Sequence, residues 1–147
     1  MAHHELDGHI FTQIVAMGAQ FLSQKVKQVD ALNVFPVPDG DTGTNMNLTL
    51  TTGIEEMKRN ESRRVGQVAG ALSRGLLMGA RGNSGVILSQ LFRGFAKAIN
   101  ENEIITSREF ALALQQGVDT AYKAVIKPVE GTVLTVAREA ARHARKT

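Results

Sequence analysis

Two aspartates in the segment Asn33–Asn47 are the residues of this sequence best suited to chemistry. The segment reads N-V-F-P-V-P-D-G-D-T-G-T-N-M-N, so Asp39 and Asp41 flank a single glycine. At a separation of about 4 Å, two bare carboxylates would repel each other by about 4 kcal/mol at an effective dielectric constant of about 20. No Lys or Arg lies between Lys27 and Lys58. The pair therefore favours a hard divalent cation with oxygen ligands, Mg²⁺ or Ca²⁺, drawn from solution.

The residues around this pair predict a loop that opens onto a helix. Pro36 and Pro38 fix φ and lack a backbone N–H, so the chain there cannot continue a helix or a central strand. After the pair come turn and capping residues, and then apolar residues at helical spacing, which predict a helix from about Thr44 to Lys58. The positive end of this helix would lie beside the metal and stabilise an anion, above all a phosphate. The segment thus predicts a magnesium-nucleotide site.

A second glycine-rich stretch, Gly79–Gly85, reads G-A-R-G-N-S-G and leads into an apolar helical repeat that reaches Ile99. One interpretation is a tight turn between helices, with Ser84 as the cap. The other is a second phosphate cradle, in which Gly82 lets the backbone approach the anion while Ser84 and the helix start donate to it. The stretch contains no lysine, which excludes a Walker loop.

Two other sites that use an Asp-x-Asp pair fit poorly. An EF-hand that begins at Asp39 requires glycine at its sixth position and an acidic residue at its twelfth, where this chain has Thr44 and Leu50. A phosphatase of the haloacid dehalogenase type places its pair after a hydrophobic strand, whereas two prolines and helical periodicity surround this one.

The remaining sequence predicts an all-α bundle. A first amphipathic helix runs from Glu5 to about Lys27, and a third helix follows Ser62 as its N-cap. A capping box of Thr106 and Glu109 predicts a fifth helix from about Ser107 to Val125, and a sixth begins after Thr132. No segment alternates as a β-strand would. The sixth helix is still under way at the last residue, which indicates a C-terminally truncated fragment.

Composition places the chain among globular proteins. At 147 residues with 43% hydrophobic and 21% charged residues, residues 1–147 are expected to form one domain. The absence of cysteine excludes thiol chemistry and disulfides. Without a membrane span or a signal peptide pattern, a cytoplasmic location is expected. The net charge of +3 and the aromatic content of 5% argue against nucleic-acid binding.

Three segments resemble the N-terminal nucleotide domain of bacterial fatty acid kinase and, more distantly, the L subunit of dihydroxyacetone kinase. They are residues 33–47, residues 75–90 (G-L-L-M-G-A-R-G-N-S-G-V-I-L-S-Q) and residues 127–132 (K-P-V-E-G-T). The resemblance covers nearly the whole chain. It implies an antiparallel barrel-like bundle of about eight helices, about six of them in this chain, that binds its nucleotide at one end through Mg²⁺.

Carried over by position, the resemblance makes Asp39 and Asp41 ligands of Mg²⁺, with two ions expected. The third ligand would be Asn33 or, less favoured, Asp30. The implied nucleotide-binding residues are Thr42, Gly43, Thr44, Asn45, Gly82, Asn83 and Ser84 at the phosphates and Leu77, Met78, Thr132 and Leu134 around the adenine. Beyond the metal ligands, no catalytic residue is expected in this chain.

The implied reaction is ATP-dependent phosphorylation of a fatty acid to an acyl phosphate, with the acid presented by a separate fatty-acid-binding carrier protein. The acceptor's machinery would lie in later domains, so this chain alone should bind ATP or ADP without turnover. The resemblance leaves open whether the full-length protein is a homodimer. Three alternatives remain at this stage: a dihydroxyacetone or other small-alcohol kinase, a nucleotide-responsive regulatory module, and a plain helical bundle whose glycine loops are only turns.

Overall fold

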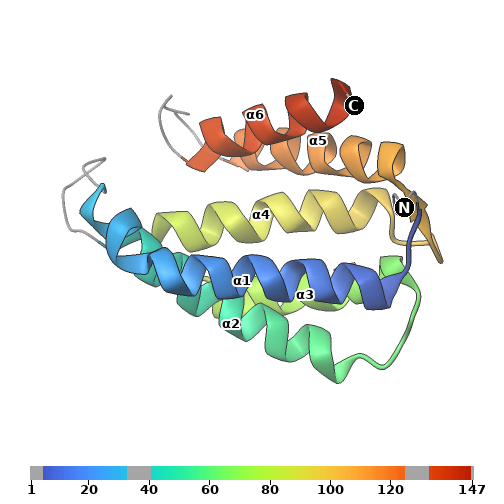
Figure 1. Cartoon of the computed structure of the whole chain (residues 1–147), viewed down its shortest axis with the longest axis horizontal. Coiled ribbons are helices and arrows are strands. Elements are labelled where there is room, and N and C mark those ends of the chain that lie inside the picture. Colours follow the sequence, from blue (N-terminus) through green and yellow to red (C-terminus); the bar gives the residue numbers. More distant parts are fainter. Residues whose placement is uncertain (1–4, 33–40, 125–132, 147) are drawn as a thin grey trace.

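The chain is almost entirely helical (Figure 1). The computed structural model describes residues 5–32, 41–124 and 133–146. In chain order the elements are β1 (Glu5–Leu6), α1 (Gly8–Ala31), α2 (Thr42–Arg59), α3 (Val65–Gly79), α4 (Gly82–Ala98), β2 (Ile105–Thr106), α5 (Ser107–Ala124) and α6 (Val133–Lys146). The predicted all-α bundle of about six helices is confirmed.

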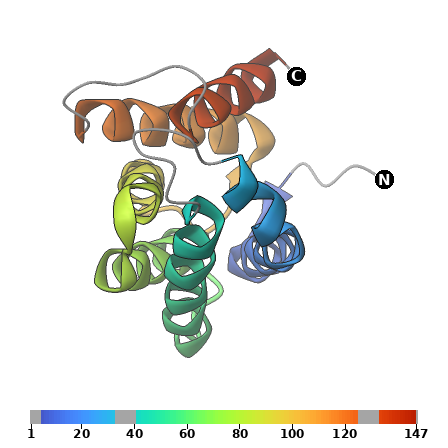
Figure 2. The same ribbon diagram turned by 90° about the vertical axis from the view of Figure 1, so that its left-hand side faces the viewer.

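Helices that follow one another in the sequence pack against one another. α1 packs on α2 and α3, α2 also contacts α4, and α4 separates this group from α5 and α6 (Figure 1). In Figure 2 the molecule is turned so that the end where α1 stops and both α2 and α4 start faces the viewer. The fold therefore gathers at one end the segments that the sequence marks for chemistry.

Phenylalanine rings join α1, α4 and α5 in the core. Phe95 of α4 is 1% exposed and stacks on Phe11 of α1, with ring centroids 5.6 Å apart. It also meets Phe110 of α5 edge-on at 5.2 Å and Phe92 at 6.0 Å. Such pairs contribute about 0.5–1.5 kcal/mol each beyond the area they bury. This cluster fixes α4 between the two groups of helices.

A two-residue strand pair, absent from the sequence prediction, ties the start of α1 to the start of α5. β1 and β2 are antiparallel, with Leu6 opposite Ile105, and both of these side chains are buried. Two residues are too few for a period-two pattern to show in the sequence. The predicted capping box is confirmed beside the pair. Thr106 N–H donates to Glu109 Oε1 at 2.9 Å, and Glu109 N–H donates to Thr106 Oγ1 at 3.1 Å.

Several helix ends differ from the prediction. α1 begins at Gly8 rather than at Glu5, because Glu5 and Leu6 form β1 and Asp7 caps the helix. α1 continues beyond Lys27 to Ala31, and α2 begins at Thr42, because the Asp41 carbonyl already accepts from Asn45 N–H at 2.8 Å. Ser62 is not the N-cap of α3. Its hydroxyl accepts from the backbone N–H of Arg64 at 3.1 Å, and Arg64 itself is the N-cap. Local hydrogen bonds thus extend the end of α1 and the start of α2, and they move the start of α3 to Val65.

The apolar stripe predicted on α1 is only partly buried. Phe11 and Val15 are buried, but Ile14, Met17 and Phe21 are 43%, 69% and 64% exposed. α1 packs mainly on α2 and α3, and these three side chains of its apolar arc remain exposed at the surface of the described structure. None of the helices in the described parts of the chain combines the length and the apolar content needed to cross a membrane.

Gly66 allows α3 to approach the backbone that follows α4. A Cβ atom added at Gly66 would collide with the carbonyl oxygens of Ile99 and Asn100, whereas one added at Gly70 of the same helix would meet only the far end of Arg74, at 3.5 Å. We expect Gly66→Ala to lower the free energy of unfolding by about 1–3 kcal/mol, as overpacking does. Gly70→Ala should raise it by about 0.5–1 kcal/mol, because alanine is the better helix former.

Urea denaturation of both variants beside the wild-type chain would measure these changes. A gain of stability at both positions would contradict the close approach at Gly66.

Candidate nucleotide site at two helix starts

The first turns of α2 and α4 contact each other. Ser84 Oγ in the first turn of α4 donates to the Thr42 carbonyl at 3.1 Å, and Gly82 packs against the side chain of Asn45. These four residues come from the two loops that were predicted to hold phosphate. Ser84 is not the N-cap of α4, a position that Arg81 occupies. The structure therefore brings the two predicted phosphate loops together, and their occupation by a nucleotide stays a prediction.

Gly82 has a backbone conformation that the contact requires. Its φ of +65° lies in the left-handed region, and it is the one described residue with a positive φ. The chain reaches it through the extended residues Ala80 and Arg81 and then turns directly into α4. A Cβ at Gly82 would also collide with the amide nitrogen of Asn45. Glycine thus serves both the turn and the approach of the two loops.

Thr49, buried between the same two loops, was not recognised as part of the site from the sequence. Its hydroxyl donates to the Asn45 carbonyl at 2.7 Å and accepts from the backbone N–H of Arg81 at 3.0 Å. The side chain is 0% exposed. The sequence holds little signal for this role: Thr49 directly precedes Leu50 of the predicted apolar stripe, and its residue type does not mark it as buried.

Asp30 reaches across from the last turn of α1 to the first turn of α2. Its Oδ1 accepts from Thr44 N–H at 3.0 Å, and its Oδ2 accepts from Thr44 Oγ1 at 2.6 Å. The hydrogen bond from the Thr44 hydroxyl, helped by the N–H groups of Thr44 and Gly43, holds the pKa of the Asp30 carboxyl below its ordinary value of 3.8, although desolvation acts in the opposite direction. Asp30 is therefore a carboxylate at neutral pH, engaged by α2.

Asp41 is the half-buried N-cap of α2, yet its side chain makes no capping hydrogen bond. The other predicted metal ligands, Asp39 and Asn33, lie outside the described residues. Within the described parts of the chain, no group of three or more His, Asp or Glu side chains is placed to hold a metal ion. The chemistry of the Asp41 carboxylate suits Mg²⁺, and the predicted ligand set remains a prediction.

The predicted adenine contacts are divided between surface and core. Leu77 and Met78, at the end of α3, are 58% and 70% exposed. Leu134 is 2% exposed, because it lies on the face of α6 that packs with Leu91 and Val118. Thr132 lies outside the described residues. Asn83, predicted at the phosphates, is exposed in the first turn of α4. Leu77 and Met78 are thus the accessible members of the adenine set.

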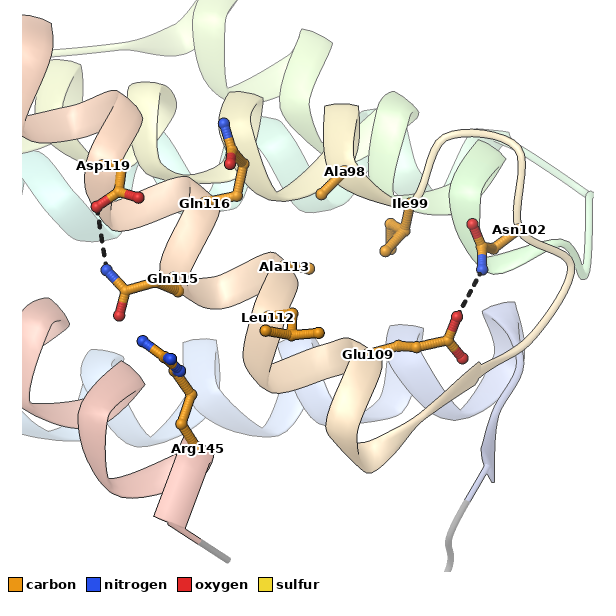
Figure 3. A pocket seen from close by; sticks show the side chains of 10 residues that line it. All are labelled: Ala98, Ile99, Asn102, Glu109, Leu112, Ala113, Gln115, Gln116, Asp119 and Arg145. Atoms are coloured by element: carbon orange, nitrogen blue, oxygen red, sulfur yellow. Dashed lines mark hydrogen bonds between the residues drawn. The ribbon is translucent and has the colours of Figure 1, made fainter.

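An open pocket of about 480 Å³ lies elsewhere, between the end of α4 and α5, with Arg145 of α6 at its edge (Figure 3). α4 runs for 17 residues, so this pocket is about 25 Å from the helix start at Gly82. Its polar side chains pair with one another: Asn102 donates to Glu109 at 3.2 Å and Gln115 to Asp119 at 3.0 Å (Figure 3). The pocket is separate from the two helix starts.

Comparison with known proteins gives a family match over most of the chain. The family described as the DAK2 domain matches residues 36–147. Protein YloV of Bacillus subtilis is 62% identical over 144 residues, which are 98% of this chain and 26% of that protein. A Staphylococcus saprophyticus protein is 59% identical over 137 residues, or 93% of this chain and 25% of its own length. The chain spans about a quarter of the length of these curated relatives.

The bridge made by Thr49 gives a testable prediction. Thr49→Val keeps the shape of the side chain but leaves the backbone N–H of Arg81 without its acceptor, so we expect the free energy of unfolding to fall by about 1–3 kcal/mol. Thr51→Val is the matched control. Its hydroxyl is exposed and, among the described residues, donates to the Asn47 carbonyl of its own helix, so its effect should stay within about 0.5 kcal/mol. Equal effects of the two variants in chemical denaturation would refute the bridging role.

Proposed function

The chain belongs to the DAK2 domain family, and we propose that it is the Mg²⁺-nucleotide-binding domain of a kinase that phosphorylates a protein-bound fatty acid. One observation carries the nucleotide site: the first turns of α2 and α4 meet at Thr42, Asn45, Gly82 and Ser84. Helix starts offer free N–H groups and the positive end of the helix dipole, which favour a phosphate. Two such starts at one place suit a polyphosphate.

The charge of the site calls for a divalent cation. A triphosphate beside Asp41 adds negative charge where no Lys or Arg occurs between Lys27 and Lys58. The uncapped carboxylate of Asp41, together with Asp39, would hold Mg²⁺, which neutralises the phosphate oxygens. In the proposed complex, α2 and α4 orient the phosphates, and the exposed Leu77 and Met78 provide an apolar surface for the adenine.

In the proposed reaction, a carboxylate oxygen of the fatty acid attacks the γ-phosphorus of ATP. The new C–O–P linkage forms as the bond between the γ-phosphorus and the β,γ-bridging oxygen breaks, which gives an acyl phosphate and ADP without net proton transfer. Phosphoryl transfer depends mainly on positioning and on charge neutralisation. This chain would supply both for the nucleotide, and the parts of the longer relatives beyond it would supply the acceptor site and bind the carrier protein.

The second candidate is phosphorylation of dihydroxyacetone or another small alcohol, which the family match favours. The two candidates share the nucleotide site and differ in the acceptor. The segment that contains the two prolines and the acid pair, P-V-P-D-G-D-T, supports the fatty acid kinase, because it resembles the corresponding segment of that family. A regulatory module that reports ATP would use the same site without transfer.

Thermal unfolding with ADP tests the nucleotide site. At a ligand concentration of 100 times its dissociation constant, ADP with Mg²⁺ should add about 2.7 kcal/mol to the free energy of unfolding, which raises the melting temperature by several degrees.

Removal of Mg²⁺ with a chelator, or the substitution Asp41→Asn, should abolish most of this shift. Asp119→Asn is the matched control and should keep the shift, because Asp119 lies on α5, where its carboxylate accepts from the Gln115 side chain, away from the two helix starts. A shift that is independent of Mg²⁺, or fully kept in Asp41→Asn, would rule out the proposed metal site.

The acceptor is tested with the full-length protein that contains this domain. We expect ADP release from ATP when a carrier-bound fatty acid is supplied, and none with dihydroxyacetone. The reverse pattern would select the small-alcohol kinase. Binding of ATP without ADP release in either case would select the regulatory module.

A further inference from the structure

The first turn of α2 is capped by Asp30 of the preceding helix and not by its own N-cap residue, Asp41. An N-cap aspartate ordinarily accepts a hydrogen bond from the N–H of the second or third helical residue. Asp7 does so at the start of α1, where its Oδ1 accepts from Ile10 N–H at 2.9 Å. At the start of α2, the equivalent third residue is Thr44, whose N–H donates instead to Asp30 of the preceding helix.

The backbone of Asp41 explains why its own side chain does not cap. Asp7 has φ −95° and ψ −177°, the extended conformation typical of an N-cap. Asp41 has φ −122° and ψ 7°, outside that region. The rotation of about half a turn in ψ changes the direction of the side chain relative to the helix that follows. The Asp41 carboxylate is therefore not directed at the N–H groups of the first turn of α2.

We propose that Asp30 is a positioning residue that caps α2 in place of Asp41 and so leaves the Asp41 carboxylate available to a divalent metal. This inference rests on the proposed function, because it assigns Asp41 to Mg²⁺. Both oxygens of Asp30 are occupied by Thr44. In this arrangement Asp30 acts on the helix start and is not assigned as a metal ligand. Thr44, whose N–H and hydroxyl both bond to Asp30, stabilises the helix start rather than a phosphate.

The position of Asp30 at the end of α1 is unfavourable for α1 itself but suits a cap of α2. A carboxylate in the last turn of a helix lies at the negative end of that helix dipole, which is unfavourable. The positive end of α2 compensates for it. Gly43 makes the approach feasible, because a Cβ there would lie 2.8 Å from the Val26 carbonyl oxygen and 3.1 Å from Asp30 Oδ1. Gly43, Thr44 and Asp30 together hold the end of α1 against the start of α2.

Two substitutions of Asp30 separate capping from charge. Asn caps helices about as well as Asp, so Asp30→Asn should keep the dissociation constant of ADP in Mg²⁺ within about threefold of the wild-type value. Asp30→Ala removes the acceptor and should weaken the Mg²⁺-dependent binding by about 10-fold or more, as loss of a supporting residue near a metal ligand does. Asp7→Ala, which removes the cap of α1 at the other end of that helix, should lower the melting temperature without changing the binding.

Amide hydrogen exchange at Gly43 and Thr44 measures the cap independently of nucleotide. Both amides should exchange slowly in the wild-type chain and in Asp30→Asn, and faster in Asp30→Ala. Thr44→Val, which removes only the hydroxyl bond, should give a smaller change of the same sign and serves if Asp30→Ala folds poorly.

Unchanged exchange at Gly43 and Thr44 in Asp30→Ala would overturn the cap. Binding by Asp30→Asn as weak as that of Asp30→Ala would show that the charge of Asp30 acts at the metal, and would overturn its positioning role. A wild-type chain that fails to bind ADP in Mg²⁺ would overturn the proposed function and the metal role of Asp41, while the exchange data would still decide whether Asp30 caps α2.

Discussion

The start of α2 and the start of α4 converge, and the rest of the structure has to make this convergence stable. Each helix start carries N–H groups without a partner inside the helix and the positive end of a dipole, so two starts in contact are unfavourable unless other groups satisfy them. Two oxygen atoms from neighbouring segments accept from such N–H groups: the carboxylate of Asp30 accepts from Thr44 and the hydroxyl of Thr49 accepts from Arg81. The Ser84 hydroxyl adds a direct bond between the two starts by donating to the Thr42 carbonyl. These contacts bind α1, α2 and α4 to one another at that end.

The opposite end of the molecule holds the helices in register. The antiparallel pair of β1 and β2 and the capping box at Thr106 fix where α1 and α5 begin. The ring cluster around Phe95 then keeps α4 between α1 and α5. With one end fixed by apolar packing and backbone pairing, the other end can carry polar groups that suit an anion and a cation. The open pocket near Glu109 lies toward the end fixed by this packing, away from the helix starts.

Several residues near the helix starts serve the fold and the proposed chemistry at once. Gly82 provides a left-handed turn and, because it has no side chain, also allows the close approach of Asn45. Thr49 satisfies a buried N–H and sets the spacing of the two loops. Leu77 and Met78 add an exposed apolar surface at the end of α3. The acid pair lacks a basic residue in its own segment, between Lys27 and Lys58.

The sequence by itself determined the helices, the approximate positions of their ends and the two loops that meet. Helical periodicity and the capping box of Thr106 and Glu109 depend on residues three or four apart, and such local patterns can be read without knowing the fold. The family resemblance added the expectation that the loops converge. The sequence did not reveal the strand pair, which is too short to show a period, or that Ser62 lies outside the start of α3.

Only the tertiary structure decided which oxygen meets which N–H. In the sequence, Asp30 was predicted only as a less favoured metal ligand, and Thr49 only as a residue of a predicted helix. Their roles were not visible because their partners, Thr44 and Arg81, belong to other elements. The backbone conformation of Asp41, in which its side chain does not cap its own helix, cannot be predicted from its residue type either. Capping within one helix is local and leaves a sequence pattern. Capping by a neighbouring helix depends on how two elements pack, and that is settled by the fold.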